Sequence, residues 1–123
     1  MARILFIDDD DNIRFLLAEE LRTDGHEVLT APDGPSGLEA LDQDPELVIL
    51  DIKMPGMDGM EVLRRIKARD PGLPVLLFTA YTEPEDGARA LGADGYLVKS
   101  ADLQGLRDTV ARLCRRPGSG GQG

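Results

Sequence analysis

Aspartates follow two short apolar runs of this chain, in positions where several carboxylates could act together. Asp51 comes directly after the run Leu47–Leu50, and four consecutive aspartates, residues 8–11, follow an apolar run at residues 4–7. Short apolar runs bounded by turn residues are typical of buried strands. Carboxylates that gather at one place repel one another unless a hard cation takes their oxygens. The simplest chemistry for this pattern is a Mg²⁺ site with one carboxylate, that of Asp51, available to react.

Composition limits the classes of function that the chain can serve. Its 123 residues suffice for one domain, and 41% hydrophobic with 30% charged residues predicts a folded chain. A formal net charge of −9 argues against direct binding of nucleic acid or of an anionic membrane. The single cysteine, Cys114, excludes an internal disulfide and favours a reducing, cytoplasmic location. No stretch approaches the roughly 20 apolar residues of a membrane helix, and none resembles a signal peptide.

The elements that must position the acids alternate between strand and helix. Apolar runs predict strands at residues 3–7, 27–31, 47–50, 75–78 and 95–98. Strands that each precede a helix imply a parallel sheet with helices on both faces, and sites in such sheets form outside the carboxyl ends of the strands. The polar residues that follow the first, third, fourth and fifth strands are Asp8 and Asp9, Asp51, Thr79, and Lys99, respectively.

The first predicted helix begins with Asp10 or Asp11 as its N-cap and ends near Gly25. Its apolar face is predicted to carry Ile13, Leu16, Leu17 and Leu21. Phe15 falls on another face, close to the acids. An exposed phenylalanine there is either a contact for a kinase or an ordinary apolar surface residue.

The remaining helices follow the same alternation. Asp33 caps the second, the third stops before Pro71, and a fourth is predicted over residues 84–91 despite Gly87, which lowers its helix propensity. The fifth is stopped by Pro117 and carries Leu103, Leu106, Val110 and Leu113. Residues 1–116 are therefore expected to form the domain, and residues 117–123 a flexible Gly/Ser tail.

Four segments of the chain carry a resemblance to a known family. They are residues 4–10, residues 48–59, the pair Thr79-Ala80 and residues 92–99. Together they resemble the receiver domain of two-component response regulators, and the resemblance covers nearly the whole chain. It implies a flavodoxin-like (βα)5 doubly wound sandwich with a five-stranded parallel sheet of order 2-1-3-4-5. Lys53 and residues 79–81 look most like those of single-domain phosphorelay receivers.

The resemblance assigns a role to each acid. Asp51 would be the phosphoacceptor, attacking the phosphoryl group of a phosphohistidine to form an aspartyl phosphate. Asp9 and Asp51 would bind Mg²⁺ directly, together with the backbone carbonyl of Lys53, and Asp8 would act through a bound water. The metal would offset the charge that gathers during phosphoryl transfer.

Further residues would form a switch. Lys99 would pair with the phosphoryl group, Thr79 would donate its hydroxyl to a phosphoryl oxygen, and Tyr96 would turn inward as Thr79 moves. Implied partners are a sensor histidine kinase or a histidine phosphotransfer protein, and an unknown downstream effector. The chain would be a signalling phosphoacceptor rather than an enzyme, and a monomer or a weak phosphorylation-dependent dimer.

Two features bear on the strength and duration of the signal. The family usually has proline after the lysine of the fifth strand, joined by a cis peptide, whereas Ser100 follows Lys99 here. A cis bond without proline costs about 2.5–4 kcal/mol, so a trans bond is expected. In receivers, the residues at the positions of Lys53 and Tyr81 border the path of the hydrolytic water. Their size predicts slow self-dephosphorylation.

Three alternatives from other classes remain at this point. A pseudo-receiver would have the fold without accepting a phosphoryl group, although no acid or lysine of the site is missing. A calcium-binding loop could start at residues 8–12, although Ile13 stands where such loops need glycine. A flavodoxin-like cofactor binder shares the architecture, but the acids would repel a cofactor phosphate.

Overall fold

The computed structural model of the chain describes residues 2–52, 58–79, 92–98 and 103–114. A five-stranded sheet of order β2-β1-β3-β4-β5 lies at its centre, and the paired strands are parallel. The strands are β1 (Arg3–Ile7), β2 (Glu27–Ala31), β3 (Leu47–Leu50), β4 (Val75–Thr79) and β5 (Gly95–Val98). This order confirms the predicted flavodoxin-like topology, and the five predicted strands match within one residue.

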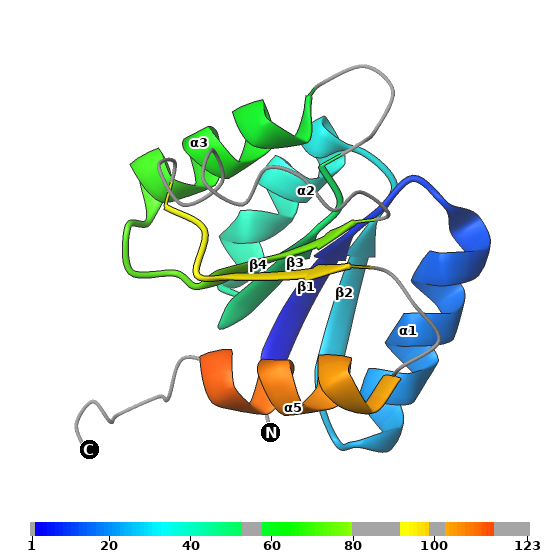
Figure 1. Ribbon diagram of the computed structural model, residues 1–123. Helices are drawn as coiled ribbons and strands as arrows, with labels where there is room; N and C mark the ends of the chain where they lie inside the picture. The colour runs from blue at the N-terminus through cyan, green and yellow to red at the C-terminus, as the bar shows by residue number, and fades with distance from the viewer. Residues whose placement is uncertain (1, 53–57, 80–91, 99–102, 115–123) are drawn as a thin grey trace.

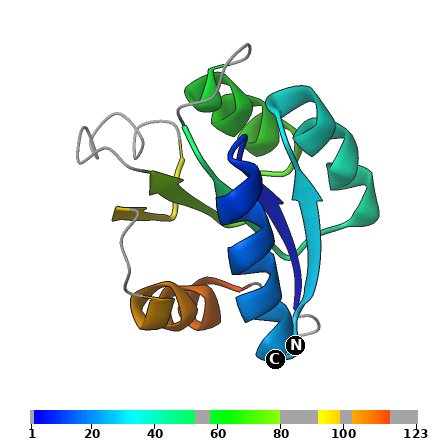
Figure 2. The ribbon, with the colours of Figure 1, turned by 90° about the vertical axis from the view of Figure 1, so that its right-hand side faces the viewer.

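Helices cover both faces of the sheet. They are α1 (Asp11–Thr23), α2 (Gly34–Ala40) with the short 3₁₀ helix η1 (Leu41–Gln43), α3 (Gly59–Arg69) and α5 (Leu103–Leu113). In both views α1 and α5 lie on one side of the sheet, and α2 and α3 lie on the other (Figures 1 and 2). The helix predicted over residues 84–91 falls outside the described residues.

Two buried clusters explain why β3 and most of β1 are apolar. Successive strand residues point to opposite faces, so β1 sends Leu5 and Ile7 toward α2 and α3, and Ile4 and Phe6 toward α1 and α5. All four side chains are fully buried. Because helices cover both faces, neither face of the central strands needs polar residues. The sheet is therefore covered on both faces, and the predicted site residues follow at the ends of its strands.

Helix starts and stops confirm the capping predictions. Asp10 accepts hydrogen bonds from the backbone N–H of Asn12 and Ile13, and so caps α1. Asp33 accepts the N–H of Ser36 at 2.8 Å, and this hydrogen bond lowers the pKa of the Asp33 carboxyl. Gly25 follows α1 with a φ of 95°, a left-handed conformation that favours glycine.

The prediction for Leu16 was wrong. Its side chain is 48% exposed, whereas Leu17, Ala18 and Leu21 are buried against the sheet. The buried stripe of α1 is narrow because only residues spaced by three or four positions from Leu21 face the sheet. Leu16 lies at the edge of that stripe, next to Phe15, which is 68% exposed as predicted.

Candidate functional site

The register between β1 and β3 brings the first acids together. Ile7 pairs with Leu50, so the residues that follow them, Asp8 and Asp51, leave the sheet side by side. The N–H of Asp51 donates to the carbonyl of Ile7 at 3.0 Å, and the N–H of Asp8 donates to the carbonyl of Ala31 at 3.1 Å. The backbone of both acids is thereby held by neighbouring strands.

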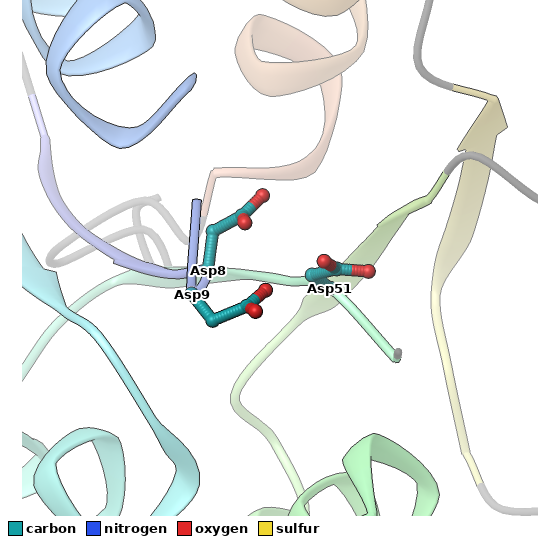
Figure 3. A group of neighbouring side chains, drawn as sticks. All are labelled: Asp8, Asp9 and Asp51. Carbon is teal, nitrogen blue, oxygen red and sulfur yellow. The ribbon is translucent and has the colours of Figure 1, made fainter. Parts of the chain in front are cut away.

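Three carboxylates gather beyond these strand ends (Figure 3). Asp8, Asp9 and Asp51 each offer a carboxylate oxygen, and these oxygens lie within 4.8 Å of one another. Asp8 is fully buried and Asp51 is 4% exposed, whereas Asp9 is open to solvent. Buried carboxylates at this separation are costly unless a positive charge joins them, and a set of oxygen donors is what Mg²⁺ prefers. The geometry therefore fits the Mg²⁺ site predicted from the sequence.

The aspartates of the acidic run, residues 8–11, have different roles. The N–H of Asp10 donates to Asp8 Oδ1 at 2.9 Å, which orients the Asp8 carboxylate. The carboxylate of Asp10 is turned to the start of α1 as its cap. Since α1 begins at Asp11, residues 11 and 12 belong to a helix. A calcium-binding loop of twelve residues would span residues 8–19, and α1 covers most of them, so the structure contradicts this alternative.

The other predicted site residues are only partly described. Thr79 ends β4 opposite Val98, so its backbone reaches the same edge of the sheet as Asp51. Tyr96 is half-buried and packs against the core on the α2 and α3 side. Lys53, Lys99 and the Lys99–Ser100 peptide bond lie outside the described residues, as does Tyr81. Their placement stays a prediction.

Gly59, at the start of α3, has a positional role that the sequence did not reveal. Its N–H donates to the carbonyl of Ile52 at 3.2 Å. A Cβ atom on Gly59 would lie 2.2 Å from the Cα of Ile52, the residue directly after Asp51. Asp58 caps the same helix by accepting the N–H of Met60. The helix start therefore packs on the backbone that carries the central acid, and only glycine fits there.

The resemblance to receiver domains implies phosphorylation of Asp51, and we predict that Gly59→Ala slows this reaction. The methyl group would displace the backbone of Ile52 and, with it, Asp51, and a misplacement near 1 Å costs up to about 100-fold in rate. The rate with acetyl phosphate and Mg²⁺ should be compared with that of Gly72→Ala, which changes an exposed turn glycine without a positive φ. Equal rates in the two variants would contradict the positional role.

Two further observations concern described residues outside the acidic cluster. The Cys114 thiol is half-buried, and burial raises its pKa, so the reactive thiolate is disfavoured at neutral pH. In the described part of the chain, no helix combines the length and the apolar character that crossing a bilayer requires.

Comparison with known proteins agrees with this geometry. A family model described as the response regulator receiver domain matches residues 4–111. Sporulation initiation phosphotransferase F of Bacillus subtilis is 37% identical over 113 residues, which are 89% of this chain and 91% of that protein. Transcriptional regulatory protein AfsQ1 of Streptomyces coelicolor is 42% identical over 119 residues, which are 94% of this chain. The match covers 52% of AfsQ1, so the chain spans about half the length of that relative.

A solved structure gives the same result for the fold. Response regulator protein TrrA of Thermotoga maritima, in complex with Mg²⁺-BeF, is 40% identical with a TM-score of 0.86. That match covers 92% of this chain and 99% of TrrA. Another crystal structure contains TrrA in complex with the histidine kinase ThkA.

Proposed function

This chain belongs to the response regulator receiver domain family, and from that membership we propose that it accepts a phosphoryl group on Asp51. The observation that carries the proposal is the cluster of Asp8, Asp9 and Asp51 beyond the ends of β1 and β3. The donor is a phosphohistidine of a sensor histidine kinase or a histidine phosphotransfer protein. A carboxylate oxygen of Asp51 attacks phosphorus, the N–P bond breaks, and its electron pair returns to the imidazole.

The acids divide the work of holding Mg²⁺ and reacting. Asp9 and Asp51 would bind Mg²⁺ directly, together with the carbonyl of Lys53, and Asp8 would act through a bound water. When bound, the metal offsets the negative charge on the phosphoryl oxygens and the carboxylates. The buried Asp8 carboxylate keeps its direction through the N–H of Asp10. Asp51 is held at the strand end by its N–H bond to Ile7.

We assign the response to phosphorylation to three further residues. Lys99 pairs with the phosphoryl group as a point charge, and the Thr79 hydroxyl donates to a phosphoryl oxygen. Tyr96 is the aromatic switch, and its half-buried packing against the core supports this assignment. The phosphoryl charge biases this two-state element through new hydrogen bonds.

The partner that donates the phosphoryl group must approach the edge of the sheet where Asp51 lies. The TrrA–ThkA complex supports a histidine kinase as that partner. On α1, the helix that follows the acidic run, Phe15 and Leu16 are adjacent exposed apolar residues. We propose that Phe15 contacts the donor. Phosphorylation then alters the surface for a downstream partner, or the group passes on to another histidine. The reaction takes place in the cytoplasm, on a monomer or a weak dimer.

Phosphorylation by a small donor tests the proposed function. The protein is incubated with acetyl phosphate, with and without Mg²⁺, and its intact mass is measured. One labile phosphoryl group should be gained only with Mg²⁺. A folded protein whose mass does not change would favour a pseudo-receiver, which binds partners without accepting phosphate.

We further propose that the phosphorylated state is long-lived. Lys53 and Tyr81 are long or bulky, and over the phosphoryl group they would hinder the in-line approach of water. The double variant Lys53→Asn, Tyr81→Ala should therefore lose its phosphoryl group faster than the wild type, as measured by intact mass over time. Identical decay curves would show that these side chains do not set the lifetime.

A further inference from the structure

Arg14 of α1 reaches back over the connection between β1 and α1. Its Nη1 donates to the backbone carbonyl of Asp8 at 2.7 Å, and its Nη2 pairs with the carboxylate of Asp11. The Arg14 side chain is only 18% exposed, although it lies among acids at the molecular surface. The two arms of one guanidinium therefore tie the end of a strand to the first turn of a helix.

This tie completes the anchoring of the residues around Asp9. Asp8 is held by its N–H bond to Ala31, by the N–H of Asp10 on its carboxylate, and by Arg14 on its carbonyl. On the other side of Asp9, the backbone of Asp10 is held, because its N–H donates to Asp8 Oδ1 and its carbonyl accepts the backbone N–H of Arg14 at 2.9 Å. Asp9 itself is exposed. The backbone on both sides of Asp9 is therefore anchored, and the Asp8 carbonyl that Arg14 holds belongs to the peptide unit leading into Asp9.

We propose that Arg14 is a positioning residue for the Mg²⁺ site, acting through the backbone on the ligand Asp9. This inference rests on the proposed function, because it assumes that Mg²⁺ binds to Asp8, Asp9 and Asp51. Groups that orient metal ligands contribute about 10–100-fold to metal affinity. Arg14 has this role at one step removed, because it holds the backbone carbonyl of Asp8, the residue before the ligand Asp9.

The charge of Arg14 provides a test, because a charge effect and a positioning effect predict opposite changes in Mg²⁺ affinity when Arg14 is removed. A guanidinium near the acids repels Mg²⁺, so its removal by charge alone would tighten metal binding. If Arg14 mainly positions Asp9, its removal weakens binding instead. The direction of the change in affinity therefore separates the two roles without any structure of the variant.

Arg22 provides a matched control on the same helix. Like Arg14, it donates to a backbone carbonyl, that of Val28 at 3.0 Å, and pairs with an acid three residues away, Glu19 at 3.5 Å. It does so at the opposite end of α1, away from the acids. If loss of such contacts destabilises α1 as a whole, the stability of Arg22→Ala should fall as well.

The experiment measures the Mg²⁺ dissociation constant by titration calorimetry, and the unfolding temperature, for each variant. Arg14→Ala should raise the dissociation constant about tenfold, and Arg22→Ala should leave it unchanged. Arg14→Lys keeps the charge, but a single ammonium cannot contact Asp8 and Asp11 as the two guanidinium nitrogens do. Its Mg²⁺ affinity should therefore lie between those of Arg14→Ala and the wild type. Phosphorylation by acetyl phosphate should recover in Arg14→Ala when Mg²⁺ is raised.

Three results would overturn the inference. Equal or tighter Mg²⁺ binding in Arg14→Ala would show that charge outweighs position. Equal weakening in Arg14→Ala and Arg22→Ala would assign the effect to the helix as a whole. If Arg14→Ala does not fold, Arg14→Lys decides. A Mg²⁺ affinity of Arg14→Lys equal to that of the wild type would show that the two-pronged guanidinium contact is not needed. Failure of the proposed function would differ, because the wild type itself would then bind no Mg²⁺ and gain no phosphoryl group.

Discussion

Asp51→Asn is expected to abolish phosphorylation by acetyl phosphate. The substitution keeps the size of the side chain and its place at the end of β3, but a neutral amide is a poor nucleophile toward phosphorus. It also removes one of the three charges that gather around the metal position. Intact mass after incubation with acetyl phosphate and Mg²⁺ should show a labile phosphoryl group on the wild type and none on the variant.

Asp44→Asn is the matched control for this change. Asp44 is exposed and precedes β3, at the opposite end from Asp51. Its φ of 63° is left-handed, a conformation that asparagine also tolerates. This variant should be phosphorylated like the wild type. A phosphoryl group on Asp51→Asn that survives at the wild-type level would place the acceptor on another residue.

The strands could be predicted from the sequence because their environment is uniform. Helices cover both faces of the sheet, so β3 and residues 4–7 of β1 are apolar, and both runs end where polar residues begin. The caps Asp10 and Asp33 were predictable for a local reason, since an N-cap bonds to backbone two or three residues away. The parallel register then placed Asp8 and Asp51 side by side, as the order of strands required.

The features that sequence did not reveal depend on contacts between distant segments. Leu16 fits an apolar pattern, but the width of the stripe on α1 is set by how the helix lies on the sheet. In the sequence Gly59 looks like an ordinary turn glycine, and only the structure shows that it packs against the backbone of Ile52. In the sequence Arg14 looks like a solvated charge, and only the structure shows that its guanidinium donates to the carbonyl of Asp8. The roles of Lys53, Thr79 and Lys99 rest on the family resemblance and stay predictions.

Asp9→Ala and Asp10→Ala should separate metal binding from helix capping. Asp9→Ala removes a direct ligand and its charge, so Mg²⁺ binding should weaken strongly and most phosphorylation should be lost. Its unfolding temperature should not fall, because one of several repelling carboxylates is removed. Asp10→Ala removes the cap of α1, at a cost of about 1 kcal/mol in the free energy of unfolding.

The Mg²⁺ site should survive in Asp10→Ala, because the N–H that Asp10 donates to Asp8 belongs to the backbone and remains. Titration calorimetry and thermal unfolding of both variants should therefore give opposite patterns. Asp9→Ala changes metal affinity and not stability, and Asp10→Ala changes stability and not metal affinity. Equal losses of Mg²⁺ binding in the two variants would mean that the acidic run is assigned in the wrong register.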